Sequence, residues 1–194
     1  MLHKPLLALY SLTHLAVDFT CAFLLFRLAA GAPDWALALL LYNFCAFAMQ
    51  MPLGAIADRL NRNGVLAAAG CALTALSALL PVPLPLAIAA GLGNALFHLG
   101  GGLDTLNDST KKAAALGIFV SPGALGLALG TLCGKAGLLP LALPPLILLV
   151  LAAAILLLCR RTYGSLCSWN APPALACAGR PAAIVPLFGV VVLR

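Results

Sequence analysis

Residues 141–159 read LALPPLILLVLAAAILLLC, a run without charged side chains that ends directly before Arg160 and Arg161. A bilayer core about 30 Å thick takes roughly 20 apolar residues per helical span. This run is therefore predicted to be a transmembrane helix. Five further apolar runs precede it, at about residues 6–30, 35–57, 65–80, 84–103 and 113–133. The sequence thus predicts an all-α membrane protein with six transmembrane helices.

The composition of the whole chain leads to the same fold class. Of its 194 residues, 63% are hydrophobic and 8% are charged. Soluble domains have about 45–50% apolar and about 25% charged residues, so a water-soluble domain is excluded. A disordered chain is excluded too, because it requires low hydrophobicity and high charge. We expect residues 1–160 to form the six-helix bundle, residues 161–181 a cytoplasmic linker, and residues 182–194 the start of a truncated seventh helix.

The basic residues predict the orientation of the bundle. With the N-terminus in the cytoplasm, the cytoplasmic segments hold Lys4, Arg59, Arg62, Lys111, Lys112, Arg160, Arg161 and Arg180, whereas the outer loops hold Lys135 alone. This bias follows the positive-inside rule. We therefore expect a multi-pass protein of the cell (plasma or inner) membrane with a cytoplasmic N-terminus. Nucleic acid is not an expected partner, because the basic residues do not cluster on one polar face.

The loop between the second and third predicted spans has the spacing G-x-x-x-D-R-x-x-R, formed by Gly54, Asp58, Arg59 and Arg62. It resembles the signature loop of the major facilitator superfamily, with Asn61 where the family usually has Gly. Asn is the next best residue for a left-handed backbone. We expect Gly54 to let two helices approach closely, and Asp58 to pair with Arg62 and latch one conformation. An ordinary positive-inside loop is the alternative.

A second resemblance lies in the predicted fifth helix, at Gly117, Ser121, Pro122 and Gly126. These residues resemble the G-x-x-x-G-P motif of the proton-coupled antiporters of that superfamily, with Ser121 in place of a Gly. Small residues allow tight helix packing, and a proline is expected to kink the helix. A generic membrane helix rich in Gly and Pro is the alternative.

Two polar pairs fall inside predicted spans, His14 with Asp18 in the first and Asn94 with His98 in the fourth. Each pair is spaced i and i+4 and so shares one helix face. An Asp at the centre of a span costs about 2.5–3.5 kcal/mol, and such groups face a bundle interior or a water-filled cavity. At 1.5 Å per residue, His14 and Asp18 lie about 12 and 18 Å from the inner side, and His98 and Asn94 about 8 and 14 Å. The depths are compatible with one shared cavity.

These residues suggest a proton-linked mechanism. We hypothesise that Asp18 with His14 is the proton-coupling pair, since an unperturbed imidazole titrates near pH 6.5. Asn94 and His98 are predicted to contact the substrate. Arg27 lies near the outer end of the first span and either snorkels to the interface or guides an anionic substrate. For each histidine, a satisfied packing residue is the alternative. No metal ion or other cofactor is predicted.

The resemblance covers about residues 5–160 and implies two inverted three-helix repeats, the N-terminal half of a twelve-helix transporter. The Phe-His pair at residues 97–98 looks like the fosmidomycin-resistance-type branch. The implied function is secondary active transport of a small molecule, with proton-coupled efflux. The implied partners are the lipid bilayer, protons, a small-molecule substrate, and a missing C-terminal half or a second copy.

Two other readings of the sequence remain open. One is a six-helix membrane assembly or remnant that transports nothing. The other is an intramembrane metal enzyme built on the two histidines and the carboxylate of the first and fourth spans. No hydrolytic motif accompanies these residues, so we do not expect an enzyme.

Overall fold

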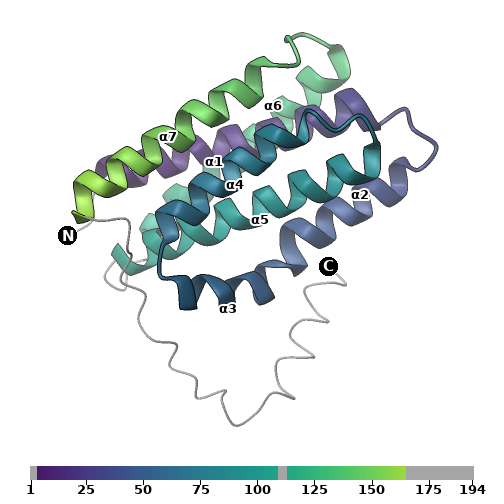
Figure 1. The fold of residues 1–194 in the computed structure, drawn as a ribbon. Coiled ribbons are helices and arrows are strands. Elements are labelled where there is room, and N and C mark those ends of the chain that lie inside the picture. The colour runs from purple at the N-terminus through teal and green to yellow at the C-terminus, as the bar shows by residue number, and fades with distance from the viewer. Residues whose placement is uncertain (1–3, 109–112, 165–194) are drawn as a thin grey trace.

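The structure is a computed structural model that describes residues 4–108 and 113–164, and every regular element in these ranges is a helix (Figure 1). The elements are α1 (Lys4–Leu24), η1 (Leu25–Ala29), α2 (Trp35–Asn43), η2 (Phe44–Ala48), α3 (Gln50–Leu60), α4 (Asn63–Ser77), α5 (Pro83–Asp108), α6 (Ala114–Ala136) and α7 (Leu143–Tyr163), where η1 and η2 are π-helical turns. The expected start of a seventh span at 182–194, and the expected linker from residue 165 onward, lie outside the described residues.

Five helical stretches are long and apolar enough to cross a membrane: Lys4–Ala29, Trp35–Leu60, Pro83–Asn107, Ala114–Ala136 and Leu143–Tyr163. They correspond to five of the six predicted spans. The remaining one, α4, has 15 residues and is about 22 Å long. It is shorter than the roughly 20 residues of a full span. Six full-length spans are therefore not found in the described part of the chain.

The outward surfaces of the long helices are apolar. On α6 and α7, Leu132, Val150 and Leu157 are 62–69% exposed. In a water-soluble protein, an apolar surface that repeats over several helices would be unfavourable. Lipid tails would cover such a surface without cost, so the exposure agrees with several apolar helices embedded in a membrane.

The predicted polar loops are shorter than expected. The loop expected at residues 58–64 shrinks to Asn61 and Arg62, because α3 continues to Leu60 and α4 begins at Asn63. Asn61 caps α3 with a φ of 50°, the left-handed conformation that its sequence position predicted. The prediction that a loop starts at Asp104 is wrong, because α5 continues through Asp108.

The most extensive helix contacts join α1 to α6 and α4 to α5, followed by α4 to α7 and α2 to α5. Glycines permit the two closest pairings. A Cβ added to Gly126 or Gly130 of α6 would overlap the backbone carbonyl oxygens of α1. A Cβ added to Gly70 of α4 would lie 2.5 Å from the carbonyl oxygen of Gly93 in α5. Small residues at such positions let helix backbones touch, so α6 fixes the position of α1 and α4 fixes that of α5.

Candidate functional site

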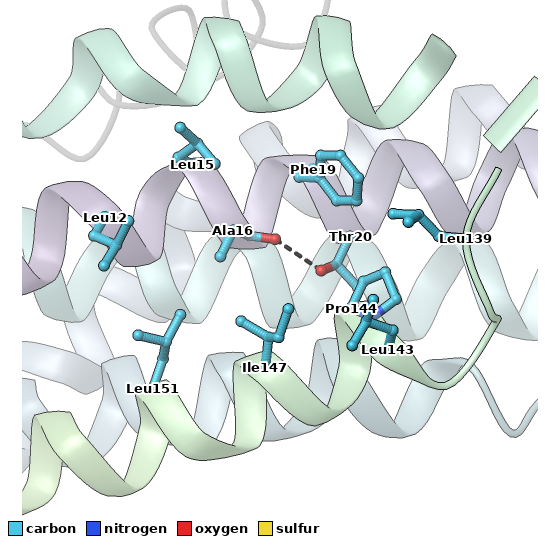
Figure 2. A pocket seen from close by; sticks show the side chains of 10 residues that line it. All are labelled: Leu12, Leu15, Ala16, Phe19, Thr20, Leu139, Leu143, Pro144, Ile147 and Leu151. Carbon is cyan, nitrogen blue, oxygen red and sulfur yellow. Dashed lines mark hydrogen bonds between the residues drawn. The ribbon is translucent and has the colours of Figure 1, made fainter. Parts of the chain in front are cut away.

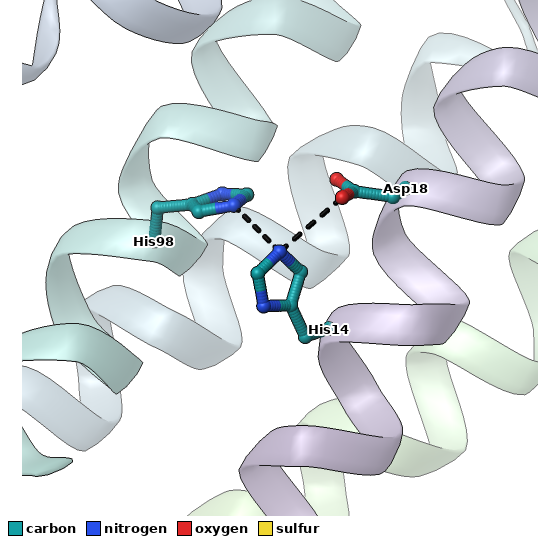
Figure 3. Close-up of side chains that lie close together, drawn as sticks. All are labelled: His14, Asp18 and His98. Carbon is teal, nitrogen blue, oxygen red and sulfur yellow. Dashed lines mark hydrogen bonds and ion pairs between the residues drawn. The ribbon is translucent and has the colours of Figure 1, made fainter. Parts of the chain in front are cut away.

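Polar side chains from α1 and α5 meet inside the bundle. His14 Nε2 lies 3.2 Å from Asp18 Oδ2 and 2.8 Å from His98 Nε2. Figure 3 shows the His14 ring between the other two side chains. Asn94 Nδ2 donates a hydrogen bond of 2.8 Å to Asp18 Oδ1. The structure thus brings together the two pairs that the sequence placed on separate helices. We call His14, Asp18, Asn94 and His98 the polar cluster.

The polar cluster lies near the middle of its two spans. His14 is ten residues from Lys4, or about 15 Å along the helix, in a stretch of 26 residues. His98 is nine residues from Asn107, or about 14 Å, in a stretch of 25 residues. Ionisable groups at such depth are costly unless they pair with one another or face a cavity. The polar cluster meets this requirement by pairing.

Both imidazole rings are oriented by backbone carbonyls. His14 Nδ1 lies 2.8 Å from the carbonyl oxygen of Phe119, and His98 Nδ1 lies 2.9 Å from that of Asn94. A carbonyl oxygen only accepts, so each Nδ1 carries the hydrogen and donates it. A neutral ring that donates through Nδ1 has an unprotonated Nε2, so two neutral rings would bring two lone pairs together at 2.8 Å. A cation between them would turn this repulsion into attraction, with the Asp18 carboxylate alongside.

One side of the polar cluster is closed and the other is more open. His14 and Asn94 are buried, whereas Asp18 and His98 are only partly buried. Phe119 stacks at an angle against His14, with ring centroids 4.8 Å apart, and Phe97 contacts the same ring. Asn94 Oδ1 is buried and has no hydrogen-bond partner among the described residues. A ligand would therefore approach past Asp18 and His98.

Gly123 and Phe119 of α6 complete the site, and neither is among the site residues predicted from the sequence. A Cβ on Gly123 would overlap His14 Nε2 and lie 2.5 Å from Asp18 Oδ2. The repeat of glycine at 123, 126, 130 and 134 marks the face of α6 that contacts α1. This repeat could have revealed the role of Gly123 from the sequence, because residues spaced by three and four share one helix face.

A second polar contact joins α1, α5 and α7. Tyr10 Oη donates a hydrogen bond of 2.7 Å to Asp104 Oδ2 and lies 3.4 Å from Cys159 Sγ. Asp104 is 4% exposed, which corrects its predicted place in a polar loop. The buried partner explains why α5 continues past this residue.

Two contacts predicted for the signature-loop residues are not found in the described part of the chain. Among residues 4–108 and 113–164, His14–Asp18 is the only contact within 4.0 Å between a basic and an acidic side chain, so Asp58 and Arg62 do not pair. Asp58 lies in the last turn of α3, whereas Arg62 follows the left-handed Asn61, and the chain reversal separates them. Arg59 is exposed. A Cβ on Gly54 would meet Leu99 at an ordinary 3.6 Å, so no close helix approach requires this glycine.

The remaining predicted residues lie away from the polar cluster. Arg27 is exposed in η1, and its guanidinium lies beside Gly137 at the C-terminal cap of α6, where helix carbonyls favour a cation. Of the predicted motif in α6, Gly117 and Ser121 are exposed and Pro122 is partly buried within the helix. A Cβ on Gly117 would meet nothing within 4 Å, whereas one on Gly126 would overlap the backbone of α1.

An apolar pocket of about 280 Å³ lies between α1 and α7 (Figure 2). Its lining residues are Leu12, Leu15, Ala16, Phe19, Thr20, Leu139, Leu143, Pro144, Ile147 and Leu151. The hydroxyl of Thr20 already donates to the carbonyl oxygen of Ala16 at 2.7 Å. The pocket therefore offers shape but little polar recognition, and it does not include the polar cluster.

Comparison with known proteins gives no family for this chain: no protein-family model, no curated protein and no solved structure matches it. The function therefore has to be argued from the geometry of the polar cluster.

Proposed function

We propose that the protein is the six-helix half of a secondary active transporter of the major facilitator type, which moves a small molecule across the membrane in exchange for protons. The observation that carries the proposal is the polar cluster, in which two imidazole nitrogens and a carboxylate converge at mid-membrane depth. Such groups in transmembrane helices mark ion and substrate pathways. Neutral side chains would suffice for hydrogen bonds that only hold helices together, whereas this cluster contains three ionisable groups.

The pairing of the helices also supports the proposal. In an inverted repeat, spans one to three superimpose on spans four to six. Here the first three spans are α1, α2 with α3, and α4, and the last three are α5, α6 and α7. The contact of α1 with α6 then corresponds to that of α5 with α2. The contact of α4 with α5 corresponds to that of α7 with α1. All four contacts are present. The resemblance of residues 54–62 to the signature loop points the same way. The resemblance of Gly117, Ser121, Pro122 and Gly126 to the antiporter motif implies the proton as the coupling ion.

In the proposed cycle, the polar cluster is the cation site of this half. Asp18 supplies negative charge, Asn94 holds its other oxygen, and His14 is fixed against α6 through Phe119. Because the site joins α1 to α5, its occupancy determines how firmly these helices are held together. A second half, or a second copy, would cover the open side at Asp18 and His98 and enclose the cargo.

The test is proton movement in liposomes that contain the full chain and a pH-sensitive dye. After an inside-acid gradient is imposed, ethidium is added as a probe of drug-type efflux. We expect ethidium to accelerate proton release, and Asp18→Asn to abolish this release while the variant still inserts. The matched control is Asp34→Asn, which removes a carboxylate in the turn before α2, outside both the polar cluster and the signature loop, and should retain the release. Release that is unchanged in Asp18→Asn, or absent with the unsubstituted chain, would overturn the proposal.

A further test concerns the second half. An antibody against the N-terminal residues would be used to blot membranes of the source cell. The chain has a mass of 19.8 kDa. A band near twice this mass supports a missing second half, and a band at this mass with a crosslinked dimer supports a second copy. A band at this mass without any dimer contradicts an enclosed two-half carrier.

A further inference from the structure

We infer that His14, Asp18 and His98 form a binding site for a divalent transition-metal cation. Each residue offers one ligand atom, and the three atoms lie within 4.8 Å of one another. As a statement about binding, the inference stands on the geometry alone. As a statement that the metal ion is the cargo, it rests on the proposed transport function.

The spacing of the ligand atoms suits a metal ion. Zinc takes imidazole nitrogen at about 2.0–2.1 Å and carboxylate oxygen at about 2.0–2.2 Å. Two nitrogens 2.8 Å apart would subtend about 85° at such an ion, and the 3.2 Å nitrogen–oxygen pair about 100°. Both angles fall close to those of octahedral and tetrahedral coordination. The widest spacing, within 4.8 Å, would close to about 4.2 Å for opposite ligands of an octahedral ion or to about 3.4 Å for a tetrahedral one, and Asp18 is only partly buried.

The orientation of both rings is that of metal-binding histidines. Such a histidine uses one nitrogen for the metal and donates the other N–H to a carbonyl or carboxylate. Here, both Nδ1 atoms donate to backbone carbonyls, and both Nε2 atoms point to the same place. Asn94 holds Oδ1 of Asp18 and leaves Oδ2 beside His14. The hydrogen bonds around the site thus prepare three lone pairs for one cation.

The donor set selects the class of cation. Imidazole nitrogen suits zinc, copper, iron and nickel, whereas magnesium and calcium prefer sites made of oxygen. Three protein ligands also leave a coordination position open, unlike the closed four-ligand sites that hold structural zinc. An open position and an accessible side at Asp18 and His98 would allow the ion to enter and leave, as a transported cargo must.

The experiment measures metal binding by the full chain purified in detergent. Zn²⁺ is the probe for stoichiometry and affinity, and Co²⁺ reports nitrogen and oxygen coordination through its visible absorption. We expect one metal ion per chain. Asn94→Ala should weaken binding by about 10–100-fold, as the loss of an outer hydrogen bond does. His14→Gln and His98→Gln should weaken it by more than about 100-fold, because they remove a ligand.

Two controls keep the result interpretable. The chain has seven cysteines, and the double variant Cys167→Ser with Cys177→Ser tests whether the two that lie outside the described residues bind the metal; it should bind as the unsubstituted chain does. Because a histidine variant could fail to fold, Zn²⁺ should also raise the unfolding temperature of the unsubstituted chain, since a ligand that binds the folded state stabilises it. Helical circular dichroism and gel filtration check each variant.

The inference is overturned if the chain binds no stoichiometric Zn²⁺, or if binding survives in both histidine variants. Its failure is distinguishable from failure of the transport proposal. Proton release driven by ethidium and abolished by Asp18→Asn, without metal binding, would leave transport standing and remove the metal. Metal binding without any proton release driven by ethidium or by Zn²⁺ would leave the site standing and remove proton-coupled transport.

Discussion

Replacing Gly123 by alanine tests whether α6 forms the wall of the polar cluster. The added methyl group would overlap His14 Nε2 and lie 2.5 Å from Asp18 Oδ2. Non-bonded carbon contacts are normally about 3.5–4.0 Å, so something must move by about 1 Å. Either α6 separates from α1, or the His14–Asp18 pair breaks. Both outcomes disturb the site from a helix that contributes no ionisable side chain to it.

The magnitude follows from two opposing effects. Overpacking in a well-packed interior costs about 1–3 kcal/mol, whereas exchanging Gly for Ala in a helix interior gains about 1 kcal/mol. Gly117→Ala is the matched control, because it lies in the same helix and its Cβ would meet nothing within 4 Å. The gain in helix propensity is common to both variants. We therefore expect Gly123→Ala to be less stable than Gly117→Ala by about 1–3 kcal/mol.

The assay is reversible unfolding of the full chain in mixed micelles, followed by helical circular dichroism, with Zn²⁺ affinity measured in parallel. Gly123→Ala should also lose at least about tenfold in Zn²⁺ affinity, which corresponds to about 1.4 kcal/mol, whereas Gly117→Ala should not. Equal stability and equal affinity in the two variants would refute the placement of Gly123 against His14 and Asp18.

Three further predictions concern the packing of the bundle. Gly130→Val should separate α6 from α1 and lower the free energy of unfolding by at least about 1–3 kcal/mol, because its Cβ would overlap a backbone carbonyl oxygen. Unfolding in micelles measures this change, and an unchanged free energy contradicts the close contact. Tyr10→Phe removes the donor to Asp104 and should cost about 1–3 kcal/mol by the same measurement, and a neutral effect would argue against that hydrogen bond. Gly54→Ala should raise the free energy of unfolding by about 1 kcal/mol, the gain in helix propensity, since its Cβ has an ordinary contact; the same measurement checks this. A severe loss of ethidium-driven proton release in Gly54→Ala would instead favour the signature-loop role.

The sequence predicted the members of the polar cluster but only part of their surroundings. The spacing i and i+4 placed His14 with Asp18, and Asn94 with His98, and their depths predicted that the pairs could meet. It could not predict which atoms converge, because this depends on how α1 and α5 are rotated about their axes. The carbonyl oxygen of Phe119 that orients His14 comes from α6, and no spacing along the chain reveals it.

Of the predictions made for the signature loop, the local one is confirmed and those about distances between segments are not. The left-handed backbone at Asn61 was predictable, because it depends on that residue and its immediate neighbours. The Asp58–Arg62 pair and the close approach at Gly54 required particular distances between separate segments, and the structure contains neither. Local backbone preferences are encoded in a few residues, whereas distances between helices depend on packing over the whole bundle.

By itself, the sequence determined that the chain has several helices long and apolar enough to cross a membrane, because apolar runs of about 20 residues with so few charges favour transmembrane helices. It also determined which ionisable groups lie at mid-span, since helix rise converts sequence position into depth. Only the tertiary structure decided that two imidazole nitrogens and one carboxylate point at each other. It also decided that Asp104 is buried against Tyr10, and that Gly123 rather than Gly117 contacts the site. The physical reason is that helix rotation and separation are determined by glycine contacts between segments far apart in the chain.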